Sequence, residues 1–269
     1  ALKNEEPRVR AYVIDALTAL GANEAVDDIV ATLDGSDYDS VAFEALRRLK
    51  AKETIPLLRN LARRSGGAAD LLADFAGAEA VPDLIAARAW DPLACVVTRE
   101  TIEPVLALFQ DPDWEVRERA VTMVEWHGGE KEAAALVPLL DDPVREIRIG
   151  AVRAIGRIGT KAMAKHLVPL LAARQGSVRS AVLDALTALR ATDAIEPIRQ
   201  RLSDPDGYVR IDAAHALAAL GESDGVAALR RFLKDPSHRL RSWSAWSLGD
   251  LHAKEAAGEI AALLKDEYP

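Results

Sequence analysis

The stretch DPDGYVRIDAAHALAALGESDGVAALRRFL, residues 204–233, contains two apolar helical patterns separated by a glycine. Apolar residues of the first pattern recur at three- and four-residue intervals, the spacing of one face of an α-helix. They are Val209, Ala213, Ala214, Leu217 and Leu220. Asp204 and Pro205 supply a capping residue and a proline that the first turn tolerates, and Gly221 ends the pattern. A second stripe at Val226, Leu229 and Leu233 completes a predicted pair of helices.

This helix pair recurs along the chain with a period of 31 residues. The period is marked by arginines that each follow a β-branched residue or a leucine: Arg117, Arg148, Arg179, Arg210 and Arg241. One pair cannot bury its apolar stripes alone, whereas stacked pairs bury them against each other. With weaker copies toward the N-terminus, the sequence predicts an all-α protein, a right-handed α-solenoid (superhelix) of about nine helical hairpins.

The middle of the sequence is less regular. The stripe of the second helix continues there, but the pattern of the first helix is weak near residues 66–77 and hardly present near 90–99. We expect a single array over residues 1–269, regular at 1–63 and 104–269 and irregular at about 64–103. Both ends of the sequence fall inside a repeat, so we expect this chain to be a piece of a longer array or of a multidomain protein.

Composition narrows the function. The 269 residues are 49% hydrophobic and 5% aromatic, with a net charge of −8, which argues against a general nucleic-acid coat. Nucleic acid is therefore an unlikely partner. A lone cysteine, Cys95, allows no internal disulfide and favours a reduced, cytoplasmic setting, and its apolar neighbours predict a buried thiol. No apolar run is long enough to predict insertion into a membrane.

The recurring pattern consists of an Asp, an Arg six residues later, an A…AL…LG stretch and a second helix such as AIEPIRQRL at residues 194–202. Over nearly the whole chain this pattern resembles HEAT repeats of the short type named after phycobilisome lyases. The resemblance implies an armadillo-like array of helical hairpins. It specifies the fold far better than the function, because this family includes scaffolds, chromophore lyases and adaptor domains.

Signatures of catalysis or metal binding are not evident in the sequence. It has no glycine-rich phosphate loop. Its histidines lack zinc-site spacing, and one cysteine is too few for a zinc site. Deoxyhypusine hydroxylases, a related repeat family, bind iron through His-Glu pairs, and none of the five histidines here precedes a glutamate. We therefore predict no catalytic residue, no metal and no cofactor.

The in-register Asp and Arg residues predict a structural ladder between repeats. An arginine fork can bond two acceptors, so each Arg is expected to bridge to the loop Asp of its own or a neighbouring repeat. A row of anion sites is the alternative. The ladder comprises Asp111, Arg117, Asp142, Arg148, Arg179, Asp204, Arg210, Asp235 and Arg241, with Ala173 in place of the acid before Arg179.

Two tryptophans in the last repeat are candidates for contact with a partner. In the 31-residue register Trp246 aligns with His215 and Asp184, and Trp243 aligns with Asp212. These are positions on the outward side of the first helices, so Trp243 and Trp246 are expected to project from the outer face. They either contact a partner or pack under a neighbouring domain.

We expect the second helices to line the concave side of the array. Their exposed charges form an acidic group, Asp27, Asp28, Asp83 and Glu103, and a basic group, Lys165, His166, Arg199, Arg201, Arg230 and Arg231. A polarised groove of this kind would orient a partner with an acidic segment. Some of these arginines could instead pair with local acids, and an ordinary mixed surface is the alternative.

The sequence therefore favours a non-enzymatic scaffold or adaptor that binds another protein, or an acidic peptide segment, along its concave face. A phycobiliprotein chromophore lyase subunit is the alternative suggested by the repeat type. A helical-repeat alkyl-purine DNA glycosylase is a weaker one, because those enzymes use concave aromatics and a carboxylate amid strong positive charge.

Overall fold

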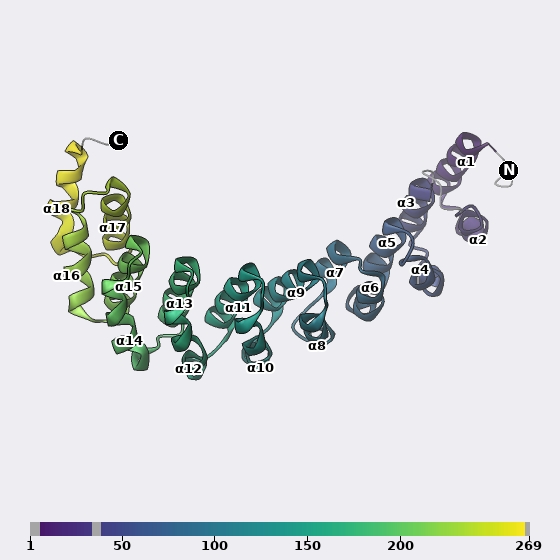
Figure 1. The fold of residues 1–269 in the computed structure, drawn as a ribbon. Coiled ribbons are helices and arrows are strands. Elements are labelled where there is room, and N and C mark those ends of the chain that lie inside the picture. The colour runs from purple at the N-terminus through teal and green to yellow at the C-terminus, as the bar shows by residue number, and fades with distance from the viewer. Residues whose placement is uncertain (1–5, 34–38, 267–269) are drawn as a thin grey trace. The chain divides into compact units, whose positions relative to one another are not determined.

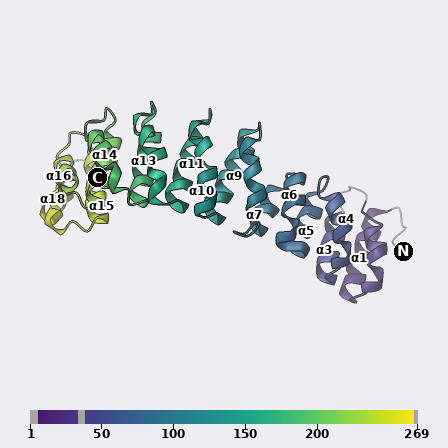
Figure 2. The ribbon, with the colours of Figure 1, turned by 90° about the horizontal axis from the view of Figure 1, so that it is seen from below.

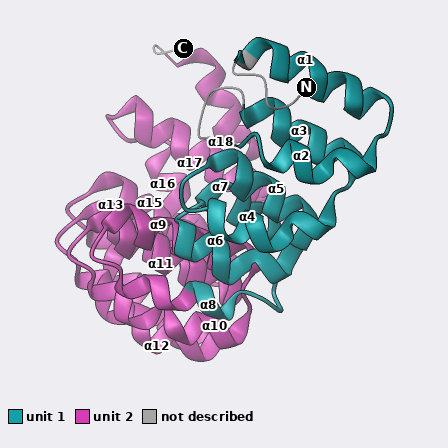
Figure 3. Ribbon diagram, turned by 90° about the vertical axis from the view of Figure 1, so that its right-hand side faces the viewer, with its two compact units in different colours: residues 1–105 teal, residues 106–269 magenta. Residues whose placement is uncertain are grey.

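The structure is a computed structural model that describes residues 6–33 and 39–266. Among these residues helices and turns make up the fold and no strand occurs, which confirms the predicted all-α solenoid. The chain divides into two compact units, residues 1–105 and 106–269 (Figure 3). Each unit is described by itself below.

Unit 1 consists of helical hairpins in which a proline often opens the second helix, as at Pro56 and Pro82. Ser65 caps a first helix by accepting a hydrogen bond from the backbone N–H of Ala68. The helices are α1 (Pro7–Ala19), α2 (Val26–Val30), α3 (Asp39–Leu49), α4 (Ile55–Leu61), α5 (Gly66–Ala76), α6 (Val81–Ala87) and α7 (Trp90–Val96), and α8 (Glu103–Leu106) crosses the unit boundary.

Unit 2 contains the hairpins with the clearest 31-residue period. Asp113 and Asp206 cap two of its first helices by accepting backbone N–H bonds from Glu115 and Tyr208. Its helices are α9 (Trp114–His127), α10 (Glu130–Ala135), α11 (Arg145–Ile158), α12 (Ala164–Leu167), α13 (Gly176–Ala188), α14 (Ile195–Gln200), α15 (Gly207–Ala219), α16 (Ser223–Phe232), α17 (His238–Asp250) and α18 (Ala257–Ala262).

Short 3₁₀ turns lead into or continue the second helices of both units. They are η1 (Asn23–Ala25), η2 (Lys52–Thr54), η3 (Gly77–Ala80), η4 (Ala107–Gln110), η5 (Val137–Asp141), η6 (Lys161–Met163), η7 (Val168–Ala172), η8 (Thr192–Ala194), η9 (Arg201–Ser203), η10 (Lys254–Ala256) and η11 (Leu263–Lys265).

The hairpins of unit 2 stack into an arc with two rows of helices. The first helices, α9, α11, α13, α15 and α17, follow the inner side of the arc, and α10, α12, α14, α16 and α18 follow the outer side (Figure 1). Seen from below, the hairpins stand side by side in chain order (Figure 2). This corrects the expectation that the second helices line the concave side, because within unit 2 the inner side carries the first helices.

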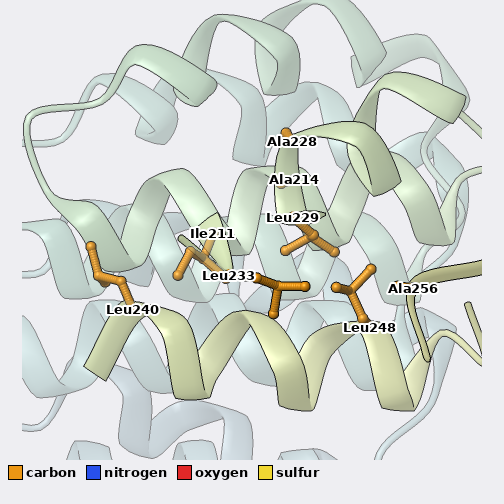
Figure 4. Close-up of a cluster of buried hydrophobic side chains, with 8 residues drawn as sticks. All are labelled: Ile211, Ala214, Ala228, Leu229, Leu233, Leu240, Leu248 and Ala256. Carbon is orange, nitrogen blue, oxygen red and sulfur yellow. The ribbon is translucent and has the colours of Figure 1, made fainter. Parts of the chain in front are cut away.

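The two rows are held together by apolar residues between them. Ile211 and Leu217 of α15 are fully buried, and Leu229 of α16 joins Ile211 and Leu248 in one cluster (Figure 4). The rows also approach closely at Gly225, where a Cβ atom would lie 2.4 Å from the backbone nitrogen of Ala218. The core is therefore built from Ala, Leu, Val and Ile packed between helices, as the low aromatic content indicates.

The stretch over residues 64–103 contains more helix than expected. Gly66–Ala76 forms a helix of 11 residues that buries Leu71 and Leu72, although the sequence pattern there is weak. The buried residues of this helix cover more than half of its circumference and leave an exposed stripe at Gly66, Asp70 and Asp74, so the apolar pattern is broader than the usual stripe. Trp90–Val96 is shorter, with seven residues. A single array with an irregular middle stays our prediction.

Candidate functional site

Successive repeats of unit 2 are joined along their loops by arginine–aspartate rungs. Arg179 of α13 donates from Nε and Nη2 to the two carboxylate oxygens of Asp204, 25 residues on, at 2.8 and 2.6 Å. Arg117 makes the same pair with Asp142, at 2.8 and 3.1 Å, and Arg241 makes it with Asp266. Each carboxylate therefore belongs to the loop of the following repeat.

Each arginine also binds its own loop, which explains the six-residue spacing in the sequence. Nη1 of Arg179 donates to the carbonyl oxygens of Ala173 and Arg174, at 2.8 and 3.1 Å. Arg148 and Arg210 make the corresponding bonds to the carbonyls of Asp142 and Asp204. At Asp142 and Asp204 the acid of the Asp-x5-Arg motif thus contributes its backbone to its own arginine and its side chain to the preceding one. Arg210 bonds its own loop carbonyls but does not bond Asp235, so the predicted ladder lacks a rung there.

The loop aspartates have a second local task. Oδ1 of Asp204 accepts the backbone N–H of Asp206 at 3.0 Å, and Asp235 accepts that of Ser237 at 2.8 Å. Asp111 and Asp142 make the same bond two residues on. This Asx-type turn fixes the loop that enters each inner helix. Asp204 is therefore held from three directions, and its side chain is fully buried.

Each first helix exposes residues on the inner side of the arc, and their positions recur at 31-residue intervals from one helix to the next. On α9 and α11 these positions include Arg153 and a tryptophan–arginine pair, in which the guanidinium of Arg157 lies 3.8 Å from the ring centroid of Trp126. On α13, α15 and α17 this face carries Asp184, Asp212 and Asp250, together with His215 and the exposed Arg239.

Trp243 and Trp246 lie on α17, the last inner helix of unit 2. Their rings are stacked with centroids 5.2 Å apart, and the ring of His215 lies 6.3 Å from that of Trp246. Trp243 and Trp246 are nevertheless 42% and 57% exposed. The tryptophans project away from the core as expected, but onto the inner face of the arc rather than the outer one, because their helix belongs to the inner row.

Carboxylates from three successive inner helices share the face that carries the tryptophans. The indole Nε1 of Trp243 donates to Asp212 at 3.3 Å, and Nε2 of His215 lies 3.1 Å from a carboxylate oxygen of Asp250. Asp184 lies on α13, the inner helix that comes before α15 in the row. We refer to Asp184, Asp212, His215, Trp243, Trp246 and Asp250 as the tryptophan–aspartate surface.

Two of these carboxyl groups resist ionisation. Loss of hydration, with a further contribution from the charge of Asp212, raises the pKa of Asp184 to about 6, although the residue as a whole keeps an exposed face. Loss of hydration also raises the pKa of Asp212, against the hydrogen bonds from Ser180 and Trp243 that favour its charged form. Burial therefore disfavours the charged form of both carboxyl groups in the free protein.

The basic residues singled out in the sequence lie on the outer row, and the most prominent ones are paired. Arg199 bonds Asp224, Glu222 and Glu196 at 2.6 to 2.8 Å, and Arg230 bonds both oxygens of Glu259. Arg201 donates to the carbonyl of Leu171, and Arg231 donates to that of Ala227. Lys165 and His166 lie on α12. The expected patch of free arginine charge is therefore corrected, because local acids neutralise Arg199 and Arg230.

The acidic group of the expected groove belongs to unit 1. Asp27 and Asp28 are exposed in the first turn of α2, where negative charge is favourable to the helix. Asp83 pairs with Arg59 at 3.0 Å, and Glu103 is exposed at the start of α8. These residues therefore have local roles that account for their charge.

Cys95 is exposed, which corrects the prediction of a buried thiol. Helix α7 buries Leu93, and Cys95 lies on its other side. Among residues 6–33 and 39–266, His, Cys, Asp and Glu side chains do not gather in threes that could hold a metal ion. The same residues contain no helix with both the length and the apolar character required to cross a bilayer.

Sequence reasoning found the two tryptophans but not the carboxylates that complete their surface. The signal was present, because Trp243 bonds a residue 31 positions earlier, one full repeat away. Residues in register on adjacent helices are neighbours, so Asp184, Asp212 and His215 could have been read as one cluster from the period alone.

Comparisons with solved structures agree with the fold. The complex of CpcE and CpcF of phycocyanin lyase from Nostoc sp. PCC7120 is 24% identical, with a TM-score of 0.53, and the alignment covers 68% of this chain and 80% of that one. Human deoxyhypusine hydroxylase is 22% identical over 89% of this chain and 99% of that one, with a TM-score of 0.38. A designed armadillo repeat protein in complex with the peptide (KR)4 is 20% identical over 76% and 93%, also with 0.38. The last two alignments are too loose to bear on this chain.

Family comparison is more decisive. No curated protein matches this sequence. The family model described as HEAT repeats matches in overlapping segments, residues 83–149, 102–187, 133–204, 164–249 and 195–269. The resemblance to HEAT repeats seen in the sequence is thereby confirmed. Because the matched segments span more than half of its length, this chain belongs to the HEAT-repeat family.

Proposed function

We propose that this chain is a non-enzymatic scaffold that binds another protein along the inner face of unit 2. The observation that carries the proposal is the stacked, exposed pair Trp243 and Trp246 on that face. Large aromatic side chains dominate the energetics of protein interfaces, and two adjacent ones left in water favour a partner that covers them. The row of α9, α11, α13, α15 and α17 extends this surface over several repeats.

The charge around the tryptophans supports a protein partner over DNA. A DNA-binding surface gains most of its affinity by neutralising phosphates with Lys and Arg. Here Asp212 bonds Trp243, Asp250 lies beside His215, and Asp184 is exposed on the next inner helix. The likeness to a phycocyanin lyase complex concerns the fold and singles out no residue of this chain.

Site-specific photocrosslinking tests the proposal. A benzophenone amino acid replaces Ala188 or Ala219, which are exposed at the ends of inner helices α13 and α15. Matched controls carry it at Ala134 or Ala227, exposed on outer helices α10 and α16. We expect both inner positions to crosslink to one and the same protein in the native cells, and the outer positions not to do so.

The captured protein is then purified and titrated against the chain. Trp246→Ala should weaken this binding by more than tenfold, because the substitution removes an interface anchor of about 2 kcal/mol. Equal crosslinking from the outer and inner positions, or unchanged affinity of Trp246→Ala, would contradict the proposal.

A further inference from the structure

We propose that the tryptophan–aspartate surface is a recognition site for lysine or arginine side chains in a segment of the partner protein. This inference rests on the proposed scaffold function and adds the chemistry of the occupant. It also reverses the partner charge expected from the sequence, because Asp184, Asp212 and Asp250 lie on the inner row beside the tryptophans, whereas Arg199 and Arg230 of the outer row are paired with local acids.

The aromatic rings provide the first part of the recognition. A cation above a tryptophan ring is attracted by the negative face of the π-system, and the attraction grows when water is displaced. Trp243 and Trp246 each keep a large part of their surface in solvent. They are rigid, because their rings stack on each other and the indole of Trp243 is fixed to Asp212.

The chain itself shows how such a site accepts a guanidinium group. On α9 and α11, the guanidinium of Arg157 covers the ring of Trp126, one full repeat earlier in the sequence, at 3.8 Å from its centroid. At the other end of the inner face, the position that corresponds to Arg157 is occupied by Asp250 in α17 and by Ala219 in α15. The protein thus provides an arginine for Trp126 and provides carboxylates beside Trp243 and Trp246.

The carboxylates provide the second part of the recognition. Asp184, Asp212 and Asp250 come from three successive helices of the inner row. Loss of hydration raises the pKa of Asp184 and of Asp212, so both charged carboxylates lack part of the solvation that water would give them. A bound ammonium or guanidinium group supplies hydrogen bonds and opposite charge in place of that water, so the two carboxylates stabilise the bound state more than the free one.

The helix spacing defines the pattern of the partner segment. Packed helices lie roughly 9–10 Å apart, and an extended chain advances about 3.3 Å per residue. Carboxylates on neighbouring inner helices are therefore matched by basic side chains about three residues apart. A capped 12-residue peptide of four Lys-Ser-Gly units has this spacing, and four Glu-Ser-Gly units make its opposite-charge control.

Indole resonances report binding at the site directly. The 269-residue chain has five tryptophans, and Trp→Phe variants assign their indole N–H signals. Titration with the lysine peptide should shift the signals of Trp243 and Trp246 and leave that of Trp126 in place, because Arg157 already covers it. The glutamate peptide should shift none of the three.

Charge-matched variants complete the test. Asp184→Asn with Asp212→Asn should weaken the lysine peptide at least tenfold, whereas Asp141→Asn with Asp193→Asn, exposed acids outside the inner row, should change its affinity less than twofold. Asp184→Asn alone, at an exposed position, serves if the first double variant does not fold. Equal binding of the two peptides, a shift of Trp126 as large as that of Trp246, or wild-type affinity in the Asp184 variants would overturn the inference.

These results are separable from those that test the scaffold function. If a partner crosslinks to the inner row while the lysine peptide fails to bind, the cation site is overturned and the scaffold stands. If the lysine peptide binds through Asp184 and Asp212 while no partner crosslinks to the inner row, the cation site stands and the scaffold function fails.

Discussion

Two rungs of unit 2 differ by a single side chain. Arg179 binds the carbonyls of its own loop and both carboxylate oxygens of Asp204. Arg148 binds the same two carbonyls of its own loop, but 25 residues further on it meets Ala173, which has no carboxylate. The arginine therefore has two roles. Arg148 and Arg179 both close their own loop, but only Arg179 also joins the next repeat.

The complete rung is also the more deeply buried. The side chain of Arg179 is 8% exposed and that of Asp204 is 0% exposed. Charges at such a site are stable only while both partners and their hydrogen bonds are present, because the cost of desolvation is large. Removing Asp204 is therefore expected to lower the free energy of unfolding by far more than a natural rung without the acid, such as that of Arg148, would suggest.

Asp204→Ala should produce the largest effect. It leaves the Arg179 guanidinium buried without its carboxylate and also removes the acceptor of the Asp206 N–H, so we expect a loss of about 3 kcal/mol in the free energy of unfolding. Urea unfolding measures it, together with hydrogen exchange of the loops at 173–176 and 204–207.

The control for this variant is Asp193→Ala, which removes an ion pair whose aspartate side chain is 84% exposed. That change should cost less than about 0.5 kcal/mol. Similar losses in the two variants would show that burial of the rung contributes nothing.

Acid should weaken the complete rung selectively. Burial alone would raise the pKa of Asp204, but the hydrogen bonds from Arg179 and from the Asp206 N–H prevail, and the pKa is lowered. The stabilisation is therefore fully present above the unfolded-state value near 4 and is lost as the pH falls through the lower folded-state value.

Asp204→Asn provides the measurement of this effect. The stability difference between wild type and Asp204→Asn should be constant from pH 7 to 5 and shrink below about pH 4. A difference that stays constant down to pH 2 would mean that the charge of Asp204 is not what holds the rung.

Arg148→Ala should have a smaller effect than Arg179→Ala. It removes two bonds to the carbonyls of Asp142 and Pro143, which water can replace in part, so about 1 kcal/mol is expected. Parallel denaturation curves of the two variants test the division of roles. An equal loss in both would show that loop closure, rather than the carboxylate, dominates.

Ala173→Asp should add the missing rung. The new carboxylate would stand in the position of Asp204 and Asp142, within reach of Arg148, and we expect a gain of up to about 1 kcal/mol. The same substitution in the Arg148→Ala background gives the coupling energy. A gain that persists without Arg148 would assign the benefit to capping of α13 instead of to the pair.

Much of this ladder was predictable from the sequence, because its members recur at fixed intervals. The period placed Arg117, Arg148, Arg179, Arg210 and Arg241 in equivalent positions. It left open whether each bonds the acid of its own or of the next repeat, since both choices have the same period. Helix α5 shows the opposite case, where burial on most sides erased the periodic signal that would have revealed the helix.

The charges on the second helices show why surface function was harder to predict. Arg199, Arg230 and Asp83 are expected at exposed positions from their spacing, which leaves open whether they are free or pair with neighbours of opposite charge. Their partners lie on neighbouring repeats, as Glu259 does for Arg230 and Asp224 does for Arg199. The sequence pattern predicts that a position is exposed, but it does not show whether an oppositely charged side chain of the neighbouring repeat is close enough to pair with the residue there.

By itself, the sequence determined the helical hairpins, their 31-residue period and the two projecting tryptophans, because capping, apolar stripes and register are properties of residue order. Only the tertiary structure decided which row of unit 2 lies inside the arc. The inner helices approach each other at small residues, as at Gly156, where a Cβ atom would lie 2.8 Å from Cα of Ala185. Curvature depends on how closely packed helices approach each other in each row, and this packing turned the tryptophans and their carboxylates toward the inner face.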